Sequence, residues 1–236
     1  MQHKRPTTNT PAQKKHQPNG LTILFEDRDI IVVNKINGLL TVGTDREQDK
    51  TAFALLNNYV RKGQARSKNR VYIVHRLDRD TSGVLVFAKT EKAKNYLQDK
   101  WAAFSKMYFA VVHGILEKKE DIITSYLLEN KAHRMYSVND PAKGKLSKTG
   151  YKVLKESKKF SLLEINLFTG RKNQIRVHFF ERGHPVVGDK MYGKEGKGVK
   201  RLALHAASIT ITHPFTEKEM IFETPPPSYF KTLVKD

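Results

Sequence analysis

Short apolar segments rich in β-branched residues recur along this chain, and they constrain its fold more than any other sequence feature. Leu21–Glu26 and Ile30–Lys35 are separated only by three polar residues, a spacing that predicts two strands joined by a turn. Further segments of this kind predict additional strands at Val71–Val74, Val84–Ala88, Lys106–His113, Tyr151–Lys155, Phe160–Phe168 and Leu202–Thr212. The sequence contains no internal repeat of about 20–50 residues, which excludes solenoids and propellers.

Helical signals lie between these strands. Thr90–Trp101 has an N-cap residue in Thr90 and an acid in its first turn, and Arg171–Arg182 is followed by Gly183 as a stop signal. Thr51–Lys62 has helical apolar spacing, and Tyr229–Val234 predicts a short closing helix. The mixture predicts one α+β (mixed α/β) domain over residues 21–236, with a large, mainly antiparallel sheet flanked by helices.

Residues 1–20 have a different composition. They carry no acid and no apolar periodicity, and their basic residues are Lys4, Arg5, Lys14 and Lys15. This pattern predicts a disordered basic N-terminal arm. A tail that only aids solubility is the alternative interpretation.

The charge balance indicates a polyanionic partner. The chain of 236 residues has 43 Lys and Arg against 24 Asp and Glu, a formal net charge of +19. Nucleic acid is the first candidate for that partner, ahead of an anionic membrane or an acidic protein. The chain has no cysteine, which excludes disulfides, thiolate metal sites and a cysteine nucleophile. It has no apolar run near the ~20 residues of a membrane span and no signal peptide, so we expect a cytoplasmic protein.

The sequence lacks residues that several known catalytic and metal-binding motifs require. Asp78 to Gly83 resembles the start of an EF-hand loop, but Lys89 stands where the last acidic ligand should be. Asp78 and Asp80 also suggest a magnesium-dependent phosphotransferase, but such a site needs more acids to hold the metal, and the downstream Gly188-Asp189 pair has no second carboxylate close by in the sequence. Nucleophile elbows, P-loops and zincin helices are absent from the sequence. We therefore predict no metal and no cofactor.

Two polar segments remain as candidate functional sites. The first, Val74 to Gly83, lies between two apolar strands, which is typical of a functional loop at a sheet edge, although it could be a plain surface turn. The second, Thr169 to His178, begins with Gly170, which would let a strand turn sharply into a helix. By itself, that helix could equally present a solvated basic face.

Together these segments resemble the RluA-type pseudouridine synthases. His75–Thr90 (HRLDRDTSGVLVFAKT) resembles the family's catalytic motif, and Thr169–Gly193 (TGRKNQIRVHFFERGHPVVGDKMYG) its third motif. The other three similar blocks are Leu21–Val42, Lys106–Gly114 and Arg201–Pro214, so the resemblance covers nearly all of the chain after the arm. The resemblance implies the family's fold and the isomerisation of uridine to pseudouridine in RNA, without a cofactor.

The resemblance also assigns roles. Asp78 matches the essential aspartate, Tyr108 the tyrosine that stacks on the target uracil, and Arg176 the arginine that pairs with the aspartate. Arg76 matches the arginine that enters the RNA where the target base has flipped out, and Ile175 lines the pocket. The further candidates for RNA contact in the two motifs are His75, Arg79, Arg171, Lys172 and Asn173.

The sequence departs from the family pattern at one place. Lys172-Asn173 stands where Thr-His is common, which puts RNA contacts and target choice in doubt but not the chemistry. Because only about twenty residues precede the predicted domain, we expect this protein to lack the extra N-terminal RNA-binding domain of several relatives, and we expect a monomer. Ribosomal RNA and transfer RNA are both open as substrates. A catalytically silent RNA-binding or ribosome-assembly protein on the same scaffold is the alternative.

Overall fold

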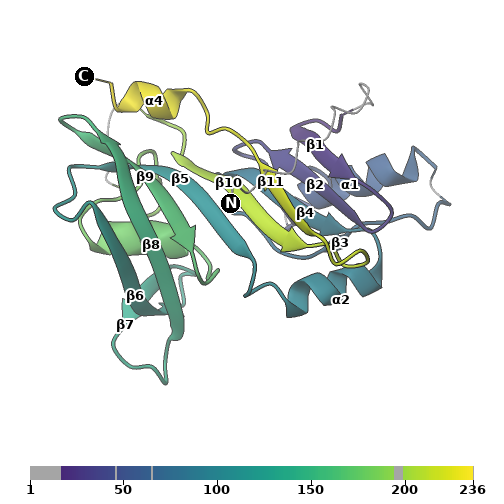
Figure 1. Ribbon diagram of the computed structural model, residues 1–236, viewed down its shortest axis with the longest axis horizontal. Coiled ribbons are helices and arrows are strands. Elements are labelled where there is room, and N and C mark those ends of the chain that lie inside the picture. Colours follow the sequence, from purple (N-terminus) through teal and green to yellow (C-terminus); the bar gives the residue numbers. More distant parts are fainter. Residues whose placement is uncertain (1–16, 46, 65, 194–198, 236) are drawn as a thin grey trace, which may run out of the picture.

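The computed structural model describes residues 17–45, 47–64, 66–193 and 199–235. One sheet dominates it, with strands in the order β1-β2-β4-β10-β5-β9-β8-β6-β7, while β3 pairs with β4 and β11 with β10 (Figure 1). All pairings are antiparallel except β4 with β10, so the predicted α+β class and the mainly antiparallel sheet are confirmed. No helix in this part of the chain is long and apolar enough to cross a membrane.

The elements follow the sequence pattern closely in the first half of the chain. They are β1 (Leu21–Glu26), β2 (Ile30–Lys35), α1 (Ala52–Arg61), β3 (Tyr72–Ile73), β4 (Ser82–Ala88), α2 (Glu91–Asp99) and β5 (Ser105–His113). As predicted, the Thr90 side chain caps α2 by accepting a hydrogen bond from the Ala93 amide at 3.1 Å. Thr51 caps α1 in the same way.

The second half contains strands that the sequence pattern did not predict. Its elements are β6 (Glu120–Glu129), β7 (Met135–Val138), β8 (Lys145–Glu156), β9 (Phe160–Leu167), α3 (Gln174–Glu181), β10 (Leu204–Thr212), β11 (Glu219–Glu223) and α4 (Tyr229–Leu233). β6, β7 and β11 are new, and β8 begins earlier than the predicted Tyr151–Lys155 segment. α3 is shorter than predicted, because the chain reaches it through Asn173 in the left-handed conformation (φ 54°). The turn was expected at Gly170, whose φ is not positive.

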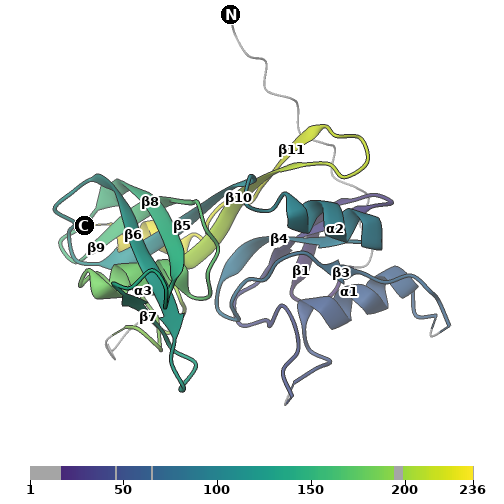
Figure 2. The same cartoon turned by 90° about the horizontal axis from the view of Figure 1, so that it is seen from below.

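Helices cover both faces of the sheet (Figure 2). In β4, Val84 and Val86 pack in the cluster that contains α2, whereas Leu85 and Phe87 pack with α1. This alternation is the period-two pattern of a strand buried on both faces. α3 and α4 cover the half of the sheet that contains β5, β9 and β8.

The residues before β1 are held against the domain. The backbone N–H of Leu21 donates to the Pro18 carbonyl at 3.0 Å, and the N–H of Ile23 donates to the side-chain oxygen of Gln17 at 2.7 Å. Thus, the last four residues that the sequence assigns to the arm lie on the sheet edge. Residues 1–16, with the four basic residues, lie outside the described part of the chain.

Candidate active site

Asp78 lies in the loop between β3 and β4, at a cleft of about 570 Å³. The cleft is bounded by this loop, by β5 and by the segment from the end of β9 to the first turn of α3. It lies where the two halves of the sheet meet. Of the predicted site residues, it brings together His75, Arg76, Asp78, Tyr108, Arg171, Lys172, Asn173, Ile175 and Arg176. Arg79 borders a second hollow of similar volume that shares Arg76, Leu77 and Asp78 with the cleft.

The Asp78 loop is fixed by the segment after β2. The Thr41 hydroxyl donates to the Leu77 carbonyl at 2.7 Å and accepts from the Leu77 amide at 3.2 Å. The Lys35 ammonium is fully buried and donates to the carbonyls of Ile36, Leu39 and Arg79 at 3.1, 2.7 and 3.1 Å. Burial lowers the pKa of Lys35 to about 7, against the opposing effect of Asp78 and Asp80. These contacts fix the backbone on both sides of Asp78.

The exit from the loop depends on a glycine. Gly83 has φ 118°, and a Cβ there would lie 2.1 Å from the Ala206 carbonyl oxygen. Only a residue without a side chain permits this approach of β4 and β10, which pair in parallel at Ser82–His205 and Gly83–Ala206. A buried hydrogen bond of 2.9 Å between the Ser82 hydroxyl and His205 strengthens the same junction.

Arg176 contacts Asp78 through a single nitrogen. Its Nη1 donates to Asp78 Oδ2 at 3.1 Å and to the Asn173 side-chain oxygen at 2.8 Å. The planar fork of the guanidinium, formed by Nε and Nη2, binds Asp189 instead, at 2.7 and 2.8 Å. In the structure, Arg176 therefore contacts Asp78 through one nitrogen and forms a shorter, bidentate pairing with Asp189.

Asp189 is a candidate site residue that sequence reasoning missed. Its side chain has no exposed surface, and its Oδ1 also accepts from the amides of Met191 and Tyr192 at 2.9 and 3.0 Å. Burial acts to raise the pKa of Asp189, but Arg176 and the two amides together hold it below its usual range. Gly188 positions it, because φ is 75° there and a Cβ would lie 2.2 Å from the Arg201 carbonyl oxygen. The Gly-Asp pair was the available signal, and the sequence interpretation weighed it only as an incomplete metal site.

Asn173 and Tyr192 complete the support for Arg176. Asn173 is buried, and its amide nitrogen donates to the Tyr192 hydroxyl at 3.4 Å. The Tyr192 ring lies 5.3 Å from the guanidinium carbon of Arg176. Burial acts to lower the pKa of Arg176, and the two aspartates reverse this effect and raise it. Hence, the arginine stays charged inside the domain.

Tyr108 and His75 are uncharged at neutral pH. Burial, together with the charge of Asp78, raises the pKa of Tyr108, so its hydroxyl keeps its proton. Burial lowers the pKa of His75 to about 3, helped by Lys106. The His75 ring stacks on Trp101 with centroids 4.2 Å apart, and its Nε2 accepts from the Val86 amide at 3.0 Å.

The predicted RNA-contacting cations differ in how far they are neutralised. Lys172 pairs with Glu129 at 2.6 Å, and Arg79 pairs with Glu47 at 2.7 Å. Arg76 and Arg171 are exposed, and neither has an acidic partner within the described ranges. Their contacts with RNA, like those of His75, Ile175 and Asn173, stay predictions.

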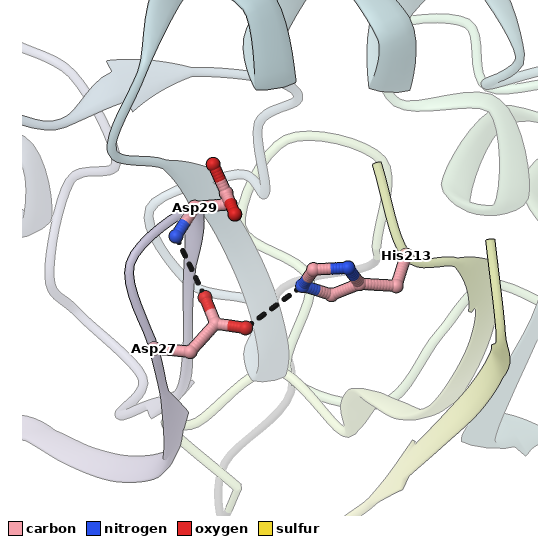
Figure 3. Close-up of side chains that lie close together, drawn as sticks. All are labelled: Asp27, Asp29 and His213. Atoms are coloured by element: carbon pink, nitrogen blue, oxygen red, sulfur yellow. Dashed lines mark hydrogen bonds and ion pairs between the residues drawn. The ribbon is translucent and has the colours of Figure 1, made fainter. Parts of the chain in front are cut away.

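A second polar cluster, formed by Asp27, Asp29 and His213, lies away from the cleft (Figure 3). His213 Nε2 donates to Asp27 at 2.7 Å, while its Nδ1 accepts from the amides of Phe215 and Thr216 at 3.2 and 3.0 Å. The other Asp27 oxygen accepts from the amides of Asp29 and Ile30. Both ring nitrogens of His213 are therefore already engaged, and the cluster links the β1–β2 turn to the β10–β11 turn.

The sequence of the chain is similar to the sequences of known proteins. Residues 29–181 match the family model described as RNA pseudouridylate synthase. The chain belongs to this family. It is therefore an isomerase of the RNA pseudouridine synthase type.

Individual relatives in this family cover most of the chain. An uncharacterized RNA pseudouridine synthase of Bacillus subtilis is 36% identical over 91% of this chain and 72% of its own length. The ribosomal large subunit pseudouridine synthase D of Nitrosomonas europaea is 35% identical over 96% of this chain and 68% of its own length. The solved structure of the human RNA pseudouridylate synthase domain containing 1 superposes with a TM-score of 0.73 at 26% identity, covering 91% of this chain and 87% of that one.

Proposed function

We propose that this protein isomerises specific uridines of structured RNA, ribosomal or transfer RNA, with Asp78 as the essential carboxylate and without a cofactor. The observation that carries this proposal is the Asp78 carboxylate, one-third exposed at the cleft and bound by a buried arginine that Asp189 holds from behind. Two relatives named ribosomal large subunit synthases C and D favour ribosomal RNA as the substrate.

The reaction exchanges one glycosidic bond for another. The N1–C1′ bond breaks, the uracil turns, a C5–C1′ bond forms, and the C5 proton leaves while N1 gains one. Asp78 acts either by attacking C1′ or by taking a proton from the sugar, and both routes need a carboxylate held in a defined orientation. Arg176 supplies this orientation because its own position is fixed by Asp189 and Asn173.

Other residues of the cleft accommodate the target uridine once it has flipped out of the RNA. The target uridine must leave its stack at a cost of a few kcal/mol before it reaches Asp78. The exposed Arg76 fills the vacancy in the RNA, and the uncharged Tyr108 ring offers a surface on which the detached uracil can turn. Phosphate contacts come from the basic stretches 61–70, 143–155 and 190–201. A cleft of about 570 Å³ lies in the size range of ligand sites that enclose a small molecule.

Pseudouridine mapping of total RNA from cells with and without this gene tests the proposal and identifies the substrate. On transcripts of that RNA, Asp78→Asn should form less than about one percent of the wild-type product while binding RNA almost as well, because the change keeps size and removes charge. Asp80→Asn is the matched control in the same loop and should remain active. Equal activity of wild type and Asp78→Asn would overturn the assignment of Asp78.

Two other functions give different outcomes. A catalytically silent RNA-binding or ribosome-assembly protein would bind these transcripts and leave every uridine unchanged. A phosphotransferase would need Mg²⁺, whereas the isomerase should work in EDTA on folded RNA. The proposal further includes a monomeric, cytoplasmic protein made of one catalytic domain and a basic arm.

A further inference from the structure

A strip of exposed side chains continues from the rim of the cleft onto the outer face of β8 and β9. Phe168 directly follows β9 and is 49% exposed, and Leu146 on β8 is 47% exposed. Lys148 lies on the same face of β8 as Leu146, because the two are separated by two positions. The Lys148 ammonium lies 5.3 Å from the centre of the Phe168 ring. The strip thus combines an exposed aromatic ring with a cation.

The Phe168 ring packs against Gly150, which has no side chain. A Cβ at Gly150 would lie only 3.0 Å from a ring carbon of Phe168, so the ring rests against the backbone of β8. The Phe168 amide also donates to the Lys148 carbonyl at 3.2 Å. The aromatic ring is therefore held on the sheet surface, although about half of it faces solvent.

The strip is rigidly connected to the cleft. Arg171 lines the cleft, and its Nε donates to the Leu146 carbonyl at 3.2 Å. The Thr169 hydroxyl accepts from the Lys148 amide and donates to the Gln174 side chain at the start of α3, both at 2.8 Å. Two residues further along α3 is Arg176, which contacts Asp78. A ligand on the strip would thus have a fixed position relative to Asp78.

The charge of the strip is available for a partner. Arg79 and Lys172 near the cleft are paired with glutamates, whereas Lys148 and Arg171 are exposed and have no acidic partner in the part of the chain that the structure describes. The guanidinium of Arg171 retains both terminal nitrogens for a phosphate.

We propose that Phe168, Lys148 and Arg171 bind an unpaired nucleotide of the substrate RNA that flanks the target uridine. The base stacks on the Phe168 ring, and the phosphate contacts Lys148 and Arg171. A base takes the place of the ammonium over the ring, because stacking on an exposed aromatic is stronger than an exposed cation–π contact. Every base has a flat face, so the subsite accepts any base. The proposal rests on the proposed function, since it extends the same RNA path.

The test compares two exposed phenylalanines. Phe168→Ala should weaken binding of a labelled single-stranded oligouridylate and of the mapped substrate transcript by about fivefold or more. Phe168→Trp should restore binding, because it restores a stacking surface. Phe215→Ala is the matched control, since Phe215 is 74% exposed in the β10–β11 turn and does not line the cleft. Lys148→Gln should lower the salt slope of log K by about one unit.

The kinetic readout separates binding from folding. With Phe168→Ala, the RNA concentration for half-maximal single-turnover rate should rise about fivefold, and the rate at saturating RNA should fall by less than twofold. Phe168→Ala and Phe215→Ala behaving alike would overturn the proposal, as would a change in self-association by sedimentation without a change in RNA binding. If wild type modifies no RNA, the proposed function fails, and the oligouridylate comparison still decides the subsite.

Discussion

Some polar groups around the Asp78 cleft are buried and bound to one another, whereas two cations at the same cleft stay exposed. Arg176 and Asp189 have 10% and 0% exposed side chains, and their contacts are 2.7–2.8 Å long. Arg76 and Arg171, which border the same cleft, are exposed. Under the proposed function, this difference means that the groups assigned to the chemistry are positioned before RNA arrives, while the groups assigned to recognition remain free to adapt to the RNA.

Asp189→Asn disrupts the buried ion pair, and we expect it to have the largest effect of the proposed substitutions. The amide would place a donor against the donating nitrogens of Arg176 and leave a buried charge without its partner. We expect a loss of roughly 3–5 kcal/mol in the free energy of unfolding, measured by urea denaturation, and loss of most activity. Because the pKa of Asp189 is lowered in the folded state, the difference from wild type should be complete above pH ~4 and shrink as the pH falls below it. A difference independent of pH would contradict the ionised pair.

Arg176→Lys should reduce kcat at least tenfold, about 1.4 kcal/mol of transition-state stabilisation. Lysine keeps the charge but cannot bind Asp189 with a fork and reach Asp78 at the same time. Single-turnover assays at saturating RNA measure this directly. Arg182→Lys is the matched control, since its contact with Asp121 lies on the surface. An unchanged kcat would mean that Arg176 does not position the carboxylate.

Arg76→Ala addresses the exposed side of the comparison. Because Arg76 has no acidic partner in the described structure, its removal should leave the free energy of unfolding within about 0.5 kcal/mol of wild type. Its loss should be visible on RNA, as a rise in the RNA concentration needed for half-maximal rate and a slower rate of base flipping followed by fluorescence of a labelled target. A large loss of stability would place Arg76 with the buried groups instead.

The smallest effect should come from deleting residues 1–16. Lys4, Arg5, Lys14 and Lys15 can contact phosphates, so the truncated protein should bind RNA less tightly at low salt, with a shallower salt slope. The deletion retains Gln17 and Pro18, which hold β1. Single-turnover rates at saturating RNA should not change. A collapse of those rates in a folded protein would show that the arm helps to assemble the site.

The sequence predicted local elements well where pattern and burial agree. β1 and β2 have the predicted bounds, because their apolar residues sit between clear turn signals. β6 was missed because only Ile123 and Leu127 are buried along its length, so its pairing with β7 and β8 leaves little periodic signal. The length of α3 was overestimated because a left-handed asparagine cannot be distinguished by composition from a helical one.

The candidate site was predictable as a set of residues and not as a network. The pairing of Arg176 with Asp78 was expected from a motif resemblance, and the structure has the two side chains in contact at 3.1 Å. The sharing of Arg176 with Asp189 depends on how the segment after α3 packs, a three-dimensional relation that spacing along the chain does not reveal. Lys35 illustrates the same limit, since an apolar strand pattern gives no reason to expect a buried ammonium bound to the backbone of the Asp78 loop.

The central place of β10 has a consequence for how the protein is made. β10 lies between β4 and β5, yet the ribosome synthesises it only after β5 to β9. Until then, the nascent chain carries two strand edges without their partner, which favours chaperone binding and misassembly. The parallel junction at Gly83 and Ala206, which fixes the exit of the Asp78 loop, also cannot form earlier. Activity should therefore emerge late, and polypeptides that stop before Leu204 should be inactive however well their earlier strands pair.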